Sequence, residues 1–209
     1  MDPHRKILIP QTREKFAALE DSKAKNLSHF VTSLGRAPLL PKPPSLIGLK
    51  GITLEEMAPD NVYDKCVLEV RIVDWPIVMK AVTMVVEDMN GQVEKLGIYN
   101  WPHESMGQLL KTFQPNRKLH IINPHLRIAM DGQRIIRVED PCYVMMGEVP
   151  SKCCHCCGEL LTGGPMKCSK CRIALYCSKE CQTHDWSELK HKLVCKHLAK
   201  YVSEVFDGI

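Results

Sequence analysis

Residues 154–195, CHCCGELLTGGPMKCSKCRIALYCSKECQTHDWSELKHKLVC, hold most of the cysteine in this chain. Eleven cysteines occur in total, and nine of them lie between positions 153 and 195. Within the quoted stretch, cysteine and histidine form four closely spaced pairs: Cys154 and Cys157, Cys168 and Cys171, Cys177 and Cys181, and His191 and Cys195. Structural zinc sites take four such ligands and leave no position open for water. The eight ligands therefore predict two structural Zn²⁺ ions.

The first pair has a second possible register, in which Cys153 and Cys156 are the ligands. The register given above is preferred because Gly158 follows its second cysteine, where the turn favours a residue that accepts a positive φ. This register leaves the two alternative cysteines as free thiols. It also points His155, which lies within the turn, to solvent.

The second half of the stretch adds a signature: the string YCSKECQ at 176–182, then Asp185-Trp186, then His191-Lys192-x2-Cys195. Together with the four pairs, this signature closely resembles a MYND-type zinc finger. In one departure from that family's pattern, four residues separate Trp186 from His191, where two are commonest. His184 is the alternative ligand. His191 is preferred because its spacing from Cys195 places both side chains on one face of a helical turn.

The resemblance implies a cross-braced arrangement, in which the first and third pairs hold one zinc ion and the second and fourth pairs hold the other. MYND fingers similar to this one bind short proline-containing peptides of partner proteins along an exposed strand and an adjacent helix. Carried over by position, that groove uses the strand 174–176 together with Ser169, Gln182 and Trp186. A free strand edge supplies main-chain hydrogen bonds, and an exposed Trp packs against proline.

The composition is ordinary for a soluble globular protein, with 44% hydrophobic and 25% charged residues among 209. A net charge of +4 is too mild to indicate a nucleic-acid or membrane partner. No apolar run reaches the roughly 18 residues that cross a bilayer, and the first residues lack the features of a signal peptide. Clustered cysteines are typical of metal binding in a reducing compartment, so we expect the nucleus or the cytoplasm.

The first 60 residues predict a helical and proline-rich extension. Apolar residues at helical spacing over 11–34 predict a helix, and the prolines within 37–48 favour an extended linker. The segment 43–47, PPSLI, resembles the peptides that MYND modules of some transcriptional corepressors bind. One hypothesis is that this segment docks in the finger of its own chain or of a second copy. The alternative is that it is only a spacer.

Alternating β-forming residues dominate the middle of the chain. They predict strands at 66–73, 78–87, 93–99, 118–122, 126–130 and 133–138. Between the third and fourth of these strands, residues 104–113 predict a short helix. Three strands, a helix and then two or three strands is the order of an OB-fold. We therefore expect an α+β protein with a small OB-like β-barrel over 61–148, a two-zinc cross-braced finger over 153–197 and a helical tail over 198–209. The barrel region also weakly resembles a segment of MYND proteins that carry tetratricopeptide or SET elements.

These features predict a zinc-binding adaptor whose finger binds proline-containing motifs of partner proteins. We expect it to act in transcriptional or other regulatory complexes. One alternative function stays open. An OB-like barrel can bind nucleic acid through a basic groove with stacking aromatics, and the finger would then act as a recruiter. Residues 61–150 supply aromatics but carry ten basic residues against eleven acidic ones, which makes this alternative weaker. Closed zinc sites and the absence of a recognisable catalytic motif argue against an enzyme.

Overall fold

A mixed sheet forms the body of the protein in the computed structural model, which describes residues 3–25, 44–102, 105–129, 132–148, 152–201 and 203. The strands are β1 (Lys50–Ile52), β2 (Asn61–Val62), β3 (Cys66–Ile72), β4 (Ile77–Val78), β5 (Ala81–Asp88), β6 (Val93–Tyr99), β7 (Lys118–Ile122), β8 (His125–Ile128), β9 (Arg134–Val138) and β10 (Val144–Met146). Hydrogen-bonded neighbours run β10-β7-β3-β5-β6-β9-β8-β2, with β1 attached to β3 and β4 attached to β5. The β1–β3 and β6–β9 pairs are parallel.

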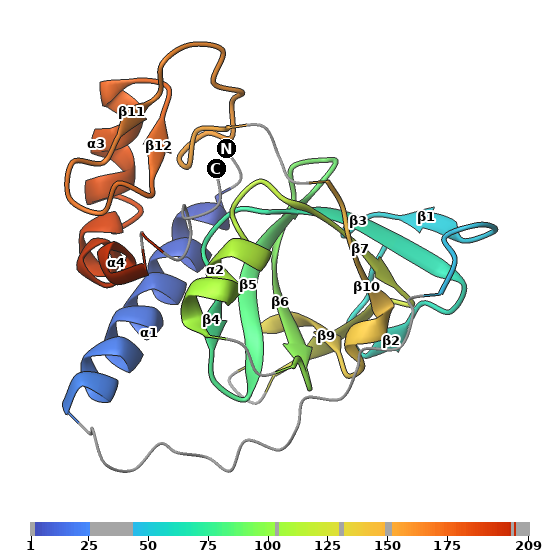
Figure 1. The fold of residues 1–209 in the computed structure, drawn as a ribbon. Coiled ribbons are helices and arrows are strands. Elements are labelled where there is room, and N and C mark those ends of the chain that lie inside the picture. Colours follow the sequence, from blue (N-terminus) through green and yellow to red (C-terminus); the bar gives the residue numbers. More distant parts are fainter. Residues whose placement is uncertain are drawn as a thin grey trace.

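The predicted strands agree with the observed ones better than the predicted architecture does. The predictions at 93–99 and 118–122 have the bounds of β6 and β7, and the others differ at their ends. The strand path has two ends, β10 and β2, and within the described residues these two strands do not pair. Although the strands curl around a common core in Figure 1, pairing does not close the sheet. The fold is a mixed helix-and-sheet structure with a C-terminal finger, and the OB-like barrel stays a prediction.

Helix α2 (Met106–Thr112) lies between β6 and β7, where the sequence predicts a helix over 104–113. It begins at Ser105, which forms a capping box with Gln108: the hydroxyl accepts from the Gln108 N–H, and the Gln108 side chain accepts from the Ser105 N–H. Leu109 and Leu110 are both buried, Leu109 in one of the two apolar clusters described below and Leu110 in the other. The helix ends at Phe113, whose fully buried ring fixes the chain before β7.

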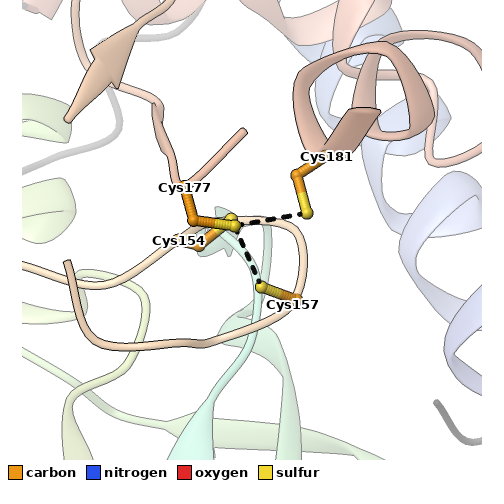
Figure 2. Close-up of side chains that lie close together, drawn as sticks. All are labelled: Cys154, Cys157, Cys177 and Cys181. Carbon is orange, nitrogen blue, oxygen red and sulfur yellow. Dashed lines mark hydrogen bonds between the residues drawn. The ribbon is translucent and has the colours of Figure 1, made fainter. Parts of the chain in front are cut away.

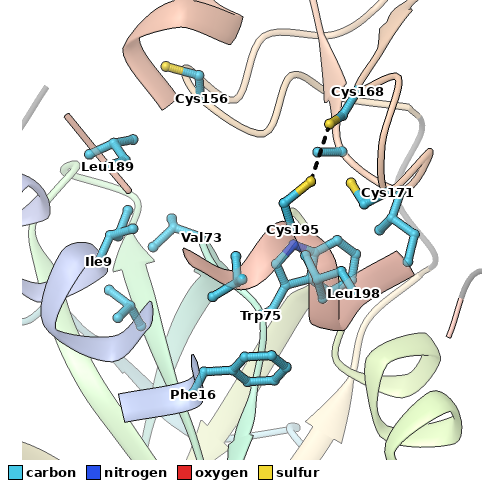
Figure 3. Close-up of a cluster of buried hydrophobic side chains, with 14 of the residues drawn as sticks. Ile9, Phe16, Val73, Trp75, Cys156, Cys168, Cys171, Leu189, Cys195 and Leu198 are labelled. Carbon is cyan, nitrogen blue, oxygen red and sulfur yellow. Dashed lines mark hydrogen bonds between the residues drawn. The ribbon is translucent and has the colours of Figure 1, made fainter. Parts of the chain in front are cut away.

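Buried apolar side chains form two clusters, one on each face of the sheet. Along β5, Met84 and Val86 belong to the inner cluster and Val85 belongs to the outer one, because successive strand residues point to opposite faces. The outer cluster also contains side chains of the first helix and of the finger, among them Ile9, Phe16, Leu189 and Leu198 (Figure 3). Three parts of the chain therefore share one core.

Helix α1 (Arg5–Lys25) begins earlier than the helix predicted over 11–34 and continues through Pro10. A proline within a helix removes one backbone hydrogen bond and strains the preceding turn. Packing offsets this cost, because Ile9 is 0% and Phe16 is 3% exposed in the outer cluster. The second part of the predicted helix, residues 26–34, lies outside the described residues.

The finger follows the sheet and lies beside α1 (Figure 1). Its elements are β11 (Met166–Lys167), β12 (Leu175–Tyr176), α3 (Lys179–Ser187) and α4 (His191–Leu198), and a short 3-10 turn follows at Ala199–Tyr201. The described part of the predicted tail packs on α1, where the Tyr201 hydroxyl donates to Glu20 at 3.0 Å. None of the helices in the described ranges has the length and apolar character to cross a bilayer.

The segment expected as an N-terminal extension contributes to the sheet. It contains β1, and its side chains Ile52, Leu54 and Met57 are buried in the inner cluster. The sheet therefore begins before residue 61. The segment proposed to dock in its own finger, 43–47, is described from residue 44 onward, and there the Ile47 side chain is 91% exposed. The described part of the segment is thus not docked in the finger of its own chain.

Candidate metal centres

The first ligand cluster joins the turn after the sheet to the start of α3. Cys154 and Cys157 lie in a turn closed by the Gly158 N–H, which donates to the Cys154 carbonyl at 2.8 Å. Gly158 has a φ of +82°, as the sequence analysis expects. Cys177 follows β12, and Cys181 lies in the first turn of α3, which the Ser178 hydroxyl caps by accepting from the Cys181 N–H.

Figure 2 shows the four sulfur atoms of this cluster facing a common centre. The Cys157 and Cys177 Sγ atoms are 3.6 Å apart, and those of Cys177 and Cys181 are 3.5 Å apart. All four Sγ atoms lie within 4.8 Å of one another. Cys154 is buried, Cys157 and Cys181 are partly exposed, and Cys177 is exposed. We call this group the four-cysteine cluster.

The second cluster joins the turn after β11 to helix α4, and all four of its ligands are buried. The Sγ atoms of Cys168 and Cys195 are 3.6 Å apart, and the same distance separates Cys171 Sγ from His191 Nε2. His191 and Cys195 lie one turn apart on α4, so both point toward the second cysteine pair. The four ligand atoms again lie within 4.8 Å of one another. We call this group the histidine-containing cluster.

These distances fit zinc and do not fit disulfides. A tetrahedron with Zn–S distances near 2.3 Å has ligand atoms roughly 3.8 Å apart, whereas bonded sulfur atoms lie about 2.05 Å apart. None of the eleven cysteines, all of which lie within the described residues, forms a disulfide. The structure therefore forms two four-ligand clusters that can hold two zinc ions, with the ligand sets that the family resemblance implies.

Comparison with known proteins identifies the segment that carries both clusters. Residues 154–195 match the pattern of the MYND finger family. These residues form a MYND finger. MYND fingers are protein-interaction modules, and with both clusters closed by four protein ligands the zinc ions are structural.

Several curated relatives share the finger, and one shares more of the chain. Tudor domain-containing protein 1 of Danio rerio is 40% identical over 52 residues, which are 25% of this chain and 4% of that protein. Programmed cell death protein 2 of Rattus norvegicus is 55% identical over 42 residues, 20% of this chain and 11% of that protein. The zinc finger MYND domain-containing protein 10 homolog of Drosophila melanogaster is 25% identical over 198 residues, 90% of this chain and 41% of that protein. This chain thus spans less than half the length of each.

The alternative ligands remain outside both clusters. Cys156 is 2% exposed and packs in the outer apolar cluster, while Cys153 pairs with Leu160 in an isolated β-bridge. His184 lies on α3, and its buried Nε2 atom has no hydrogen-bond partner within the described residues. The preferred register and His191 are therefore the set that the structure brings together.

His155 does not point to solvent, contrary to the sequence-based expectation. Its Nδ1 atom accepts a hydrogen bond from the Leu175 N–H at 2.6 Å, and its backbone N–H donates to the Leu175 carbonyl at 2.8 Å. Its ring stacks on Trp75 at 5.4 Å between centroids, with 24° between the ring planes. The expectation failed because Trp75 comes from the loop after β3, far away in sequence, and offers the ring an apolar surface.

A buried polar network lies behind the histidine-containing cluster. Asp185 on α3 accepts a hydrogen bond from the Tyr176 hydroxyl at 2.7 Å, and its Oδ2 atom lies 3.7 Å from His191 Nδ1. Its Oδ1 atom accepts from Arg13 Nη1 at 2.7 Å. Arg13 also forms a two-point contact with Asp74, in which its Nε and Nη2 donate to the carboxylate at 2.9–3.1 Å. The roles of Arg13 and Asp74 and the contacts of Asp185 were not predictable from sequence, because residues far apart in the chain form this network.

Burial and charge oppose each other in this network. Burial acts to lower the pKa of Arg13, but the charges of Asp185 and Asp74 outweigh it and raise that pKa above its ordinary value. Burial also acts to raise the pKa of Asp185, and Arg13 outweighs it and holds that pKa below its usual value. For Asp74 burial prevails, so its pKa is raised. Asp185 therefore carries the more firmly held negative charge of the two carboxylates.

The three residues predicted to bind peptide lie in two segments of the finger, the turn after β11 and helix α3. Ser169 is exposed in the turn between Cys168 and Cys171, while Gln182 and Trp186 are partly exposed on α3. The Lys170 ammonium lies 5.2 Å from the centroid of the Trp186 ring, and that ring lies 5.9 Å from the His191 ring.

The strand edge predicted for peptide binding is not free. Residues 174–176 are buried: β11 pairs with one edge of β12, and the contacts of His155 with Leu175 occupy the other. The open edge belongs to β11 instead, because within the described residues no strand pairs with its outer side. Lys167 at the end of β11 is two residues before Ser169, so the open edge leads directly into the predicted surface.

Proposed function

We propose that this protein is a non-catalytic adaptor inside the cell, in the nucleus or the cytoplasm, whose MYND finger binds a proline-containing segment of a partner protein. The observation that carries the proposal is the partly exposed ring of Trp186, which lies 5.2 Å from the ammonium of Lys170, three residues after β11, whose outer edge is unpaired within the described residues. A two-stranded hairpin with one unpaired edge accepts a further strand through main-chain hydrogen bonds. The partly exposed indole of Trp186 suits the flat, rigid ring of proline.

The positions of Ser169 and Gln182 support the same surface. Ser169 lies in the turn two residues after the end of β11, and Gln182 lies one helical turn before Trp186 on α3. Lys170 above the indole adds a cation to the rim of this surface. These groups offer one hydrophobic contact, hydrogen-bonding side chains and a free backbone edge, which is what recognition of an extended peptide requires.

The experiment is a binding titration with the full chain, loaded with two zinc ions, and a fluorescent peptide of sequence PPSLI, taken from positions 43–47. We expect binding, and Trp186→Ala should weaken it about tenfold or more, since that corresponds to about 1.4 kcal/mol of lost contact. Gln182→Ala should weaken it less. Thr183→Ala, an exposed neighbour on the same helix, is the matched control and should change nothing. The proposal is wrong if the wild-type protein does not bind the peptide, or if Trp186→Ala binds it with the same affinity as the wild type.

We infer further that the sheet belongs to the OB-like class. Only Asn123 and Pro124 separate β7 from β8, and β7 pairs with β3 while β8 pairs with β9. Strands β7 and β8 can therefore be regarded as one bent strand that pairs with β3 at one end and with β9 at the other. This pairing supports the barrel interpretation, as does the position of α2 between β6 and β7.

Three side chains that a nucleic-acid site on this sheet would use have partners within the protein. Arg71 forms an ion pair with Glu87, and Arg134 forms one with Glu94. Trp75 is stacked on His155 and only 6% exposed, so its ring face is not available to a base. The adaptor function is therefore the one we retain.

A further inference from the structure

Arg13 lies at the centre of the contact between α1, the sheet and the MYND finger. Its guanidinium donates to Asp74 in the loop after β3, to Asp185 on α3, and to the Leu189 carbonyl at 2.9 Å. The side chains of Arg13, Asp74 and Asp185 are 3%, 2% and 0% exposed. Arg13 and Asp185 are separated by 172 positions in the sequence.

Arginine is the residue type that fits this arrangement. The planar guanidinium presents five N–H donors in a fixed fork, so it can bond one carboxylate at two points and still reach two further acceptors. A lysine would keep the charge but would offer no such fork. Buried charges are costly unless they are paired and hydrogen-bonded, and each member of this network has a partner of opposite charge.

Asp185 connects this contact to the histidine-containing cluster. Its Oδ2 atom faces the Nδ1 side of His191, whose Nε2 atom faces Cys171. Within the described residues His191 Nδ1 has no hydrogen-bond partner, and the Asp185 carboxylate lies 3.7 Å from it. A metal-bound histidine normally presents its second ring nitrogen to a carboxylate or carbonyl, which fixes the tautomer and strengthens the ligand.

We propose that Arg13 is a positioning residue of the second zinc site, so that docking of helix α1 and retention of zinc in the histidine-containing cluster stabilise each other. Arg13 holds Asp185 in place, and Asp185 orients His191. Because coupling between two equilibria is reciprocal, removal of zinc from this cluster weakens the docking of α1, and release of α1 weakens zinc binding. The four-cysteine cluster has no contact with Arg13 among the described hydrogen bonds and ion pairs, so the coupling is specific to one site.

The experiment uses the full chain loaded with ¹¹³Cd²⁺, whose two resonances distinguish the sulfur-only site from the site with one nitrogen ligand. A chelator is added, and the loss of each resonance is followed with time. Arg13→Met is expected to speed the loss from the histidine-containing site roughly tenfold, the lower end of the effect of outer-shell partners, and to leave the four-cysteine site nearly unchanged. Arg13→Lys should fall between wild type and Arg13→Met.

Two controls separate positioning from general destabilisation. Lys15→Met removes an exposed cation from the same helix and should change neither rate. Asp74→Asn weakens the contact with the sheet but keeps the Arg13–Asp185 pair, so it should lower the unfolding temperature and change the ratio of the two rates less than Arg13→Met does. If Arg13→Met does not fold, Asp185→Asn replaces it, with the same expected selectivity for the histidine-containing site.

A second readout tests the reciprocal effect. Hydrogen exchange of the α1 backbone amides should rise when the zinc-loaded protein loses the ion of the histidine-containing site, and it should stay low when only the four-cysteine site is emptied. The proposal is overturned if Arg13→Met accelerates both losses equally, if it accelerates neither, or if exchange in α1 does not respond to the ion of the histidine-containing site.

Discussion

The two zinc clusters of the MYND finger have similar ligands but different surroundings. In the four-cysteine cluster Cys177 is exposed, and Cys157 and Cys181 are partly exposed. In the histidine-containing cluster every ligand is at most 3% exposed. Both clusters therefore contact the core that the finger shares with α1 and the sheet, the first through buried Cys154, but only the first has an exposed side.

The two clusters also differ in their contacts with the rest of the protein. The turn of the four-cysteine cluster contacts the sheet through the Gly158 carbonyl, which accepts from Arg71 at 3.3 Å, and through the stacking of His155 on Trp75. The histidine-containing cluster is backed by the fully buried network of Asp185, Arg13 and Asp74. The surroundings of the four-cysteine cluster thus connect the finger to the sheet, whereas those of the histidine-containing cluster connect the finger to both α1 and the sheet.

The largest expected effect comes from removing one ligand of each cluster. Cys195→Ser should release the buried zinc and destabilise the whole chain, since a structural zinc site contributes on the order of 10 kcal/mol to folding. Cys177→Ser should release the other zinc but leave α1 docked, because its surroundings are exposed. Zinc content by native mass spectrometry and thermal unfolding of both variants test this. Equal loss of stability in the two variants would show that burial does not separate the clusters.

The finger was predictable from sequence because its information is local. Ligand spacing, Gly158 and the YCSKECQ string all lie within 42 residues, and they led to the eight residues that the structure brings together. Most strands were predictable for the same reason, since alternation is a local pattern. The capping box of α2 is also local, because Ser105 and Gln108 are only three positions apart.

What connects the parts was not predictable, because the contacts form between distant residues. The residues around Arg13 contain no pattern that predicts its contact with Asp185. The same is true of His155 and its stacking on Trp75. Helix α1 begins at Arg5 rather than at residue 11, because tertiary packing of Ile9 supports a helical turn that continues through Pro10. The free edge was assigned to β12 rather than β11, since only the folded chain reveals that His155 covers one side of β12.

An intermediate effect is expected where the four-cysteine cluster contacts the sheet. Gly158→Ala adds a Cβ 2.3 Å from Arg71 Nη1 at a backbone φ of +82°, which L side chains rarely adopt. We expect a cost of about 1–3 kcal/mol, as for other strained backbone positions, measured by thermal unfolding. The loss of metal from the four-cysteine site should accelerate more than the loss from the histidine-containing site. Gly163→Ala, whose added Cβ meets no atom within 4 Å, is the matched control and should be neutral. If the two alanine variants behave alike, the contact with Arg71 has no energetic role.

The smallest effect is expected from replacing Cys153 or Cys156, the two cysteines next to the first ligand pair that are not ligands. It tests whether these two side chains bind zinc or only pack. Cys156 is 2% exposed among apolar side chains, so Cys156→Ala should cost about 1 kcal/mol for the lost buried volume and keep two zinc ions. Cys153→Ala should also keep two zinc ions, because Cys153 lies outside both clusters. Zinc counting by native mass spectrometry decides between the registers, since a fall to one ion in either variant would assign the four-cysteine site to the shifted pair. Two ions in both variants would mean that burial of Cys156 serves the shared core, as burial of Cys168 and Cys195 does in addition to their role as ligands.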